Sequence, residues 1–166
     1  EPYYYYGYAF STILFQTQND FDNFKLAIDS YVDDLDDVFT IDGPDAAVEF
    51  VADDWNYNNV GASITVGGKE TALRLREGIE RFFITDINNP GGSTQAQSEI
   101  VLMHDATAEE PAHFNHIPGG ANVLYLDGHV EFIKWAGGGE LSNPFPVNLA
   151  GFYLHEAGEG LAHAHP

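Results

Sequence analysis

The sequence predicts an α+β fold in which N-terminal helices pack on an antiparallel β-sheet. Apolar residues at helical spacing dominate an early stretch, and β-prone runs separated by turn residues follow it, which together carry the prediction. The 166 residues are enough for one domain, spanning 1–166, with a substantial core. The hydrophobic fraction of 44% and the aromatic fraction of 14% argue against a disordered chain.

The opening segment is aromatic and β-prone. Residues 3–15 combine tyrosine, phenylalanine and β-branched residues, which predicts an extended segment at the edge of a sheet. Its tyrosines would place rings on both faces of a strand, so we expect burial either in a central strand or against a neighbouring subunit. The candidates for a subunit interface are Tyr3, Tyr4, Tyr5, Tyr6 and Tyr8.

Two helices are predicted next. Thr17 and Asp20 have the spacing of a capping box, which marks a helix start. Apolar residues then recur at helical spacing for about four turns. They are Phe21, Phe24, Ile28, Tyr31, Val32 and Leu35. We expect this helix to end in the acidic run Asp33–Asp37, because carboxylates at a helix C-terminus oppose the macrodipole. A second, short helix is predicted from Pro44 towards Asp53.

In the middle of the chain and in its tail, predicted strands are separated by segments rich in glycine and proline. Residues 62–66 and 70–75 predict a hairpin around a Gly-Gly turn, and a helix is expected over 77–83. The apolar run 99–103 is typical of a buried strand. The tail from Gly137 is rich in glycine and proline and carries three of the seven histidines.

The strongest turn signal is the dipeptide Asp127-Gly128. It joins the β-prone runs Val123–Leu126 and His129–Ile133, and a Pro-Gly-Gly run at 118–120 breaks the chain just before them. Asp-Gly suits a two-residue type I′ turn, whose central residues both need positive φ. The sequence therefore predicts an antiparallel hairpin closed by this turn.

The same region carries a family resemblance. A histidine, the Gly-Gly-Ala-Asn run at 119–122, an apolar strand and Asp-Gly-His-Val follow one another. This pattern resembles the signature of the H-x9-DG domain, which occurs in bacterial pseudopilin-like proteins with a prepilin-type N-terminus. Residues 76–90 and the tyrosine-rich opening resemble the same family. The motif residues are His116, Asp127 and Gly128, and ten residues separate the first two, one more than in the family pattern.

The resemblance implies a pseudopilin-like globular domain with a structural role. Such a domain is expected in an extracellular pilus-like or pseudopilus-like filament, or in a secretion-associated assembly at the cell surface. The implied partners are further copies of the chain, forming a homopolymer, and the secretion machinery. The apolar prepilin helix does not occur in 1–166, so we expect either its removal or another route of assembly.

Composition excludes several other partners. Six Lys and Arg against 26 Asp and Glu give a formal charge of −20, which repels nucleic acid and anionic membranes. No apolar run approaches the length of a membrane span. The absence of cysteine excludes thiol catalysis, disulfides and zinc–thiolate sites. We expect no enzymatic activity and assign no catalytic residue.

Histidines and carboxylates gather between 104 and 129, where a divalent metal could bind. The candidate ligands are His116, Asp127 and His129, but their spacing matches no hydrolase signature. We favour structural roles, in which Asp127 shapes its turn and His116 caps its loop through a hydrogen bond to backbone.

Calcium is the cofactor to consider, because hard oxygen ligands occur in acidic runs. The candidate residues are Asp33, Asp34, Asp36, Asp37 and Asp86. None lies in an EF-hand pattern, and a solvated charge run is the competing interpretation. An extracellular calcium- or metal-binding module that does not polymerise is therefore the alternative function.

Overall fold

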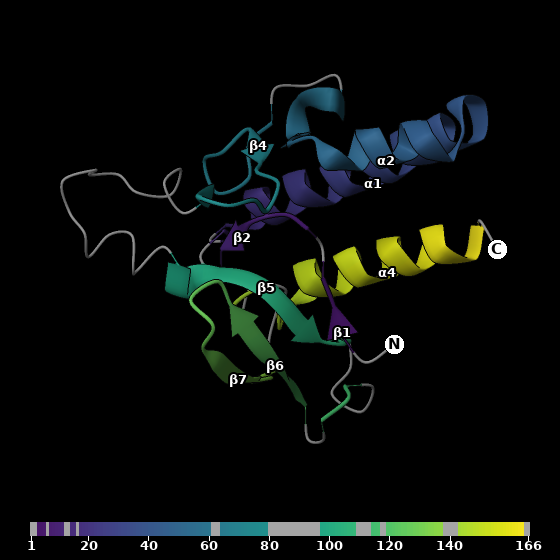
Figure 1. Cartoon of the computed structure of the whole chain (residues 1–166). Helices are drawn as coiled ribbons and strands as arrows, with labels where there is room; N and C mark the ends of the chain where they lie inside the picture. Colours follow the sequence, from purple (N-terminus) through teal and green to yellow (C-terminus); the bar gives the residue numbers. More distant parts are fainter. Residues whose placement is uncertain are drawn as a thin grey trace.

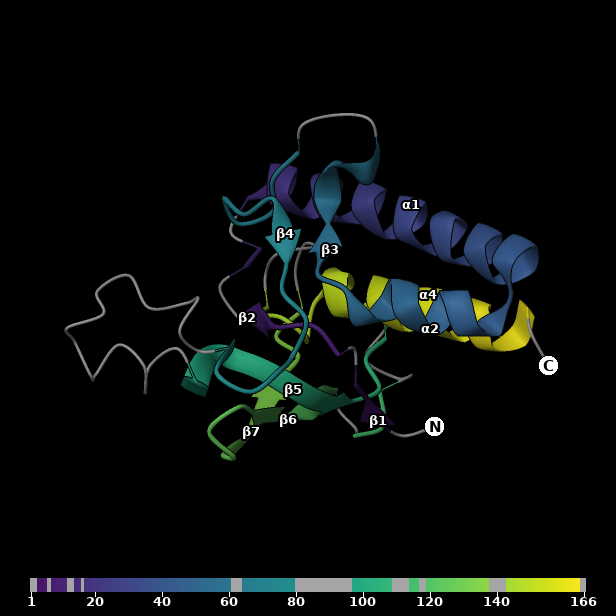
Figure 2. The same cartoon turned by 45° about the horizontal axis from the view of Figure 1, so that its top comes forward.

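The computed structural model describes residues 3–5, 7–11, 14–15, 17–60, 64–79, 97–108, 114–116, 119–137 and 143–164. Three helices lie on one side of a five-stranded antiparallel sheet (Figures 1 and 2), which confirms the predicted α+β class. The helices are α1 (Gln18–Asp42), α2 (Pro44–Ala52) and α4 (Leu149–Ala164). The sheet contains β1 (Tyr3–Tyr4), β2 (Phe10–Ser11), β5 (Ile100–Asp105), β6 (Gly120–Tyr125) and β7 (Val130–Lys134).

The strand order is β1-β5-β6-β7, and β2 pairs with β5 as well. Tyr3 lies opposite Asp105 and Phe10 opposite Val101, so the aromatic opening segment runs along β5 at one edge of the sheet. The prediction of an edge segment is confirmed. β7 forms the other edge.

Helix α1 begins where the sequence predicts. The Thr17 hydroxyl accepts a hydrogen bond from the Asp20 backbone N–H at 3.1 Å, and the Asp20 carboxylate accepts one from the Thr17 backbone N–H at 3.0 Å. This reciprocal capping box satisfies two backbone donors that the first turn leaves open. The buried residues of the helix are Phe21, Phe24, Ala27 and Ile28.

The predicted end of α1 was wrong, because the helix runs through the acidic run to Asp42. Gly43 ends it with φ 91°, and its N–H reaches the carbonyls of Val38 and Phe39 at 3.2 Å. Only glycine adopts such a φ without steric cost, and Pro44 then begins α2 as predicted. The carboxylates of Asp33–Asp37 are tolerated in mid-helix, mostly on the exposed side.

The predicted hairpin at 62–75 is partly wrong. Val66 and Lys69 form an antiparallel bridge around the Gly-Gly turn. However, β4 (Thr71–Ala72) pairs with β3 (Trp55–Asn56), which precedes the short 3₁₀ helix η1 (Tyr57–Val60). The helix predicted over 77–83 lies mostly outside the described residues.

The Asp-Gly hairpin is present, but its turn differs from the prediction. Type I′ needs positive φ at two residues, and no described residue other than glycine has one. Instead, Gly128 donates to the Tyr125 carbonyl at 2.9 Å, and Tyr125 donates to the His129 carbonyl at 3.0 Å. The loop therefore has three residues, Leu126–Gly128, with Gly128 at φ 88° in the bulge position.

Helix α4 lies in the tail, where the sequence analysis predicted no helix. Asn148 caps it, since its side-chain oxygen accepts from Gly151 N–H at 3.2 Å and its carbonyl accepts from Phe152. The helix packs against α1, where the Phe21 and Tyr153 rings lie 5.7 Å apart. No helix in the described part of the chain is long and apolar enough to cross a membrane.

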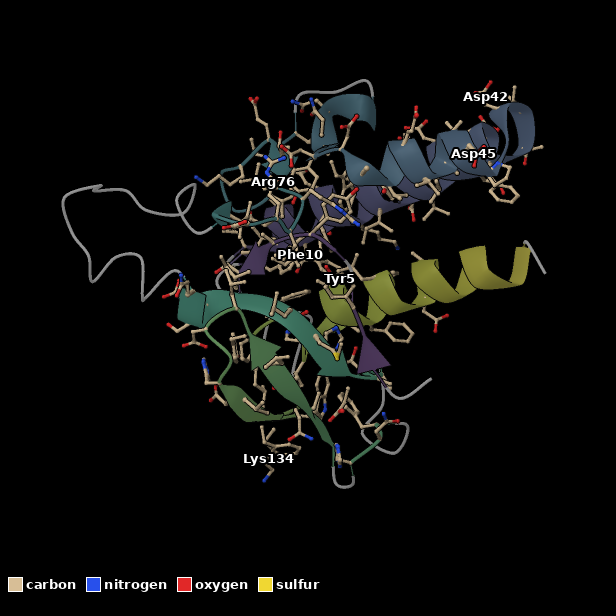
Figure 3. The ribbon with its side chains drawn as sticks, viewed as in Figure 1. Tyr5, Phe10, Asp42, Asp45, Arg76 and Lys134 are labelled. Atoms are coloured by element: carbon tan, nitrogen blue, oxygen red, sulfur yellow. The ribbon has the colours of Figure 1, made fainter. Side chains whose placement is uncertain are left out.

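An aromatic core joins the sheet to the helices. Phe10 on β2, which Figure 3 places between these two layers, is 1% exposed, and Phe24 on α1 is fully buried. Their rings make an edge contact at 5.7 Å, and Trp55 packs against both. Such edge-to-face pairs add to the stabilisation that burial provides. The core therefore holds in place the sheet that lies next to the motif residues His116, Asp127 and Gly128.

Candidate functional site

A buried carboxylate lies beside the motif histidine. Asp105 ends β5 and is 2% exposed. Its Oδ2 accepts hydrogen bonds from the backbone and the side-chain nitrogen of Asn122, both at 2.8 Å, and lies 2.8 Å from His116 Nε2. We call Asp105, His116 and Asn122 the Asp105 cluster. Its contacts provide the polar partners that a buried carboxylate requires.

The Asp105 cluster explains the motif histidine in structural terms. His116 Nε2 lies 2.8 Å from the Asp105 carboxylate and forms a 3.1 Å hydrogen bond with the side-chain nitrogen of Asn122, so it ties its loop to β5 and β6. The predicted loop-fixing role agrees with this, but the partner is a carboxylate and not the backbone. Asn122 was not predicted as a site residue, although its position in the Gly-Gly-Ala-Asn run could have indicated it.

Glycine is required at the start of β6. A Cβ on Gly120 would lie 2.5 Å from the Ile133 carbonyl oxygen and 2.7 Å from the Phe132 ring, and the residue has φ 145°. The Phe132 ring also makes an edge contact with His116 at 6.0 Å. The Gly-Gly-Ala-Asn run therefore allows close packing of β6, β7 and the His116 loop.

Asp127 and His129 form a separate pair in the hairpin turn. The Asp127 Oδ1 accepts the His129 backbone N–H at 3.0 Å and also contacts His129 Nδ1. The His129 ring stacks on Tyr125 with centroids 4.3 Å apart. The backbone hydrogen bond, followed by the side-chain bond, lowers the pKa of Asp127 below its ordinary value. Asp127 thus has a local role in the turn.

We expect a carboxyl NMR titration to give Asp127 a pKa below 3.8, and H129A to raise it part of the way back. The rise is partial because the backbone N–H at 129 remains. Because the pKa of Asp127 is lower in the folded state, the ionised carboxylate stabilises the fold at pH values above its ordinary pKa. This stabilisation is lost as the pH falls through the lowered folded-state pKa. An unchanged Asp127 pKa in H129A would show that the side-chain contact is absent in solution.

The structure does not bring the predicted metal ligands together. His116 belongs to the Asp105 cluster, whereas Asp127 and His129 pair with each other beyond the opposite end of β6. Among the described residues, no group of three or more His, Asp and Glu side chains could hold a metal ion.

The calcium candidates on α1 are also dispersed. Asp33, Asp36 and Asp37 are exposed, and Asp34 is half-buried on the same helix. In the part of the chain that the structure describes, these aspartates do not form a group of side chains that could bind a metal ion. Asp86 lies outside that part, so its role as a calcium ligand stays a prediction.

The opening tyrosines divide between core and surface. Tyr8 is 6% exposed, and its hydroxyl lies 2.9 Å from that of Tyr31 on α1. Its ring therefore belongs to the interior of the chain, which corrects its assignment to a subunit interface. Tyr5 is 58% exposed and remains available for contact (Figure 3). Tyr6 and the side chains of Tyr3 and Tyr4 lie outside the described structure.

The side of the sheet that faces away from the helices carries a run of apolar residues. Met103, Leu124 and Val130 are neighbours across β5, β6 and β7, and Phe132 lies further along β7. Val130 is 62% exposed and Phe132 48%. We call these four residues the outer sheet face. β7 has no second partner strand among the described residues, so its edge is open beside this face.

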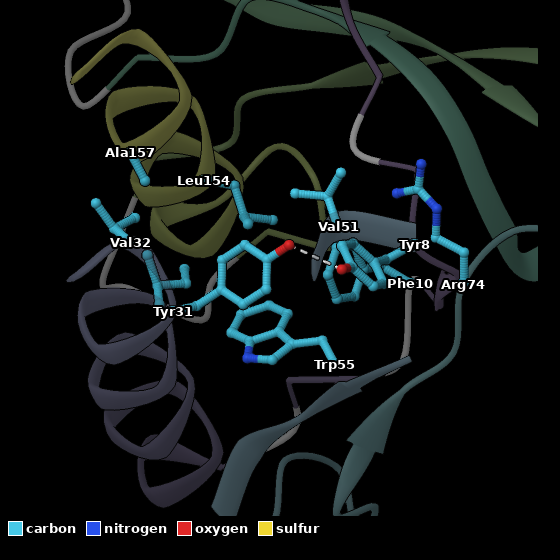
Figure 4. Close-up of a pocket in the computed structure, with 10 residues that line it drawn as sticks. Tyr8, Phe10, Tyr31, Val32, Val51, Trp55, Arg74, Leu154 and Ala157 are labelled. Atoms are coloured by element: carbon cyan, nitrogen blue, oxygen red, sulfur yellow. Dashed lines mark hydrogen bonds between the residues drawn. The ribbon is translucent and has the colours of Figure 1, made fainter. Parts of the chain in front are cut away.

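A pocket of about 190 Å³ lies among the helices and the opening segment (Figure 4). The hydroxyl pair of Tyr8 and Tyr31 lines it, and Trp55 forms part of its wall. Arg74 lines it as well, with its guanidinium carbon 5.2 Å from the centroid of the Tyr8 ring. We call it the aromatic pocket.

Comparisons of the chain with family models, with curated proteins and with solved structures found no match. The resemblance to pseudopilin-like proteins therefore stays a prediction.

Proposed function

We propose that the chain is a structural subunit of an extracellular pilus-like or pseudopilus-like filament, or of a secretion-associated assembly. Copies of the chain would associate through the outer sheet face and the open edge of β7. The observation that supports this most is the high exposure of Val130 and Phe132 on a regular edge strand.

Exposed apolar residues on a sheet edge favour association for two reasons. Burial of apolar surface contributes about 25 cal/mol per Å², and an open edge offers backbone donors and acceptors to another chain. Natural monomers usually protect such edges with charges, and β7 has Glu131 and Lys134 but no proline. The outer sheet face is therefore suited to contact with a second subunit.

The charge of −20 opposes association of like subunits. Because salt screens charges separated by more than about 8 Å at 0.15 M ionic strength, we expect assembly to increase with ionic strength. Calcium is not required by this proposal. Light scattering at increasing concentrations of sodium chloride tests this dependence.

The Asp105 cluster supports a structural role over a catalytic one. Its carboxylate accepts hydrogen bonds from Asn122 and lies against His116, so these contacts hold one loop to two strands. We assign no catalytic residue. In this proposal the motif fixes the geometry of β6 and β7, and these strands present the association surface.

Val130→Asp tests the surface, with Val48→Asp on α2 as the matched control. Both valines are exposed, at 62% and 66%, and both changes add one negative charge. We expect V130D to weaken self-association at least about tenfold, equivalent to about 1.4 kcal/mol, and V48D to leave it near the wild-type value. Analytical ultracentrifugation measures the effect, and circular dichroism checks the fold. Equal behaviour of the two variants would contradict the assignment of the surface.

A further inference from the structure

We infer that the aromatic pocket binds a small monocarboxylate that carries one aromatic ring or a short alkyl chain. The pocket lies between α1, α2, α4 and the opening segment, away from the outer sheet face. This inference does not depend on the proposed assembly.

The size of the pocket sets the size of the ligand. Its volume is about 190 Å³. An apolar cavity of about 150 Å³ holds a benzene molecule. The aromatic pocket therefore has room for one six-membered ring with a short substituent.

The walls favour an apolar body. Phe10, Ile28 and Trp55 are each no more than 5% exposed and line the pocket, and Leu154 of α4 faces them. Figure 4 shows the Trp55 and Tyr31 rings beside each other at the pocket, and their centroids lie 4.9 Å apart. A ligand ring can make offset or edge contacts with these side chains.

The polar end of the pocket offers hydrogen-bond donors. Tyr8 and Tyr31 hydrogen-bond to each other at 2.9 Å, which uses one of the two hydroxyl hydrogens. Burial raises the pKa of both tyrosines, so both hydroxyls stay protonated at neutral pH. The second hydrogen can be donated to a ligand oxygen.

Charge selects an anion over a neutral acceptor. Arg74 is the one charged side chain among the described residues that line the pocket, although the chain has 26 acidic residues. The nearby Asp54 carboxylate accepts the backbone N–H of Arg74 at 2.7 Å and pairs with the Arg76 guanidinium at 3.0 Å, so these donors neutralise part of its charge. The Arg74 guanidinium, with no ion pair to any described residue, attracts a carboxylate placed at the tyrosine hydroxyls.

Phenylacetate and its neutral analogue phenylacetamide test the inference on the full chain. We expect saturation-transfer NMR to show phenylacetate in contact with the protein, with a Kd below about 1 mM, and the amide to bind at least about fivefold more weakly. Tryptophan fluorescence should change on titration, because Trp55 lines the pocket.

Arg74→Gln is expected to reduce the affinity for phenylacetate to that for the amide and to leave the amide unchanged. Arg76→Gln is the matched control, because it removes the same charge from a neighbouring residue outside the pocket lining. Tyr31→Phe should weaken both compounds. Three results would overturn the inference: no saturation transfer at about 10 mM ligand, equal binding of acid and amide, or equal effects of R74Q and R76Q.

Discussion

Phe24→Ala is expected to lower the free energy of unfolding by about 3–5 kcal/mol. Phe24 is fully buried, and its ring lies 4.6 Å from that of Phe15, 5.7 Å from that of Phe10 and 5.8 Å from that of Trp55. The change removes aromatic contacts and leaves a cavity that rigid neighbouring rings cannot fill. Chemical denaturation followed by far-UV circular dichroism measures the loss.

Leu26→Ala is the control on the same helix. Leu26 is 55% exposed, so its truncation should cost less than about 1 kcal/mol. Equal losses in the two variants would contradict the arrangement in which α1 turns its Phe24 face to the sheet.

Asp105→Ala is expected to lower the free energy of unfolding by about 2–4 kcal/mol. The change leaves the Asn122 backbone N–H without its acceptor, and His116 loses its carboxylate partner. His116 is half exposed, so water replaces part of the lost interaction and keeps the cost below that of a fully buried ion pair. Urea denaturation of the variant measures the loss.

Two comparisons sharpen this prediction. Asp127→Ala removes a carboxylate from the exposed turn and should destabilise the fold much less than Asp105→Ala does. The double variant D105A/H116A should show non-additivity of about 0.5–2 kcal/mol, since the two side chains interact directly. Additive losses would show that the contact between His116 and Asp105 contributes nothing to stability.

The parts of the fold that depend on residues close together in the sequence were predictable. The capping box at Thr17 and Asp20 is a local device, and the structure has it at the expected position. The end of α1 was mispredicted because the destabilising effect of the acidic run on the helix was overestimated. Exposed carboxylates in mid-helix destabilise it less than the prediction assumed. Gly43, whose positive φ ends the helix, is the stop signal that the sequence contains.

Helix α4 was missed for a different reason. Three glycines and two histidines interrupt residues 149–164, and they hid the helical spacing of Leu149, Tyr153 and Leu154. The cap at Asn148 was a usable signal. Contacts with α1 stabilise a segment whose own propensity is weak.

The candidate site depends on pairing between distant residues. Asp105 meets Asn122 because β5 and β6 pair in one register, which includes an irregularity between Val101 and Met103. Local patterns do not encode that register, so the sequence could place His116 near carboxylates without identifying its partner. The aromatic pocket likewise joins segments from both ends of the chain, and nothing in the linear sequence predicted it.

Electron microscopy of the concentrated wild-type chain at near-physiological and higher ionic strength tests the central claim most directly. We expect ordered polymers in which the outer sheet face, including Val130 and Phe132, is covered by a neighbouring subunit. The V130D variant under the same conditions should give few or none. Strictly monomeric protein at every concentration and ionic strength, or polymers that leave this face open to solvent, would contradict the account.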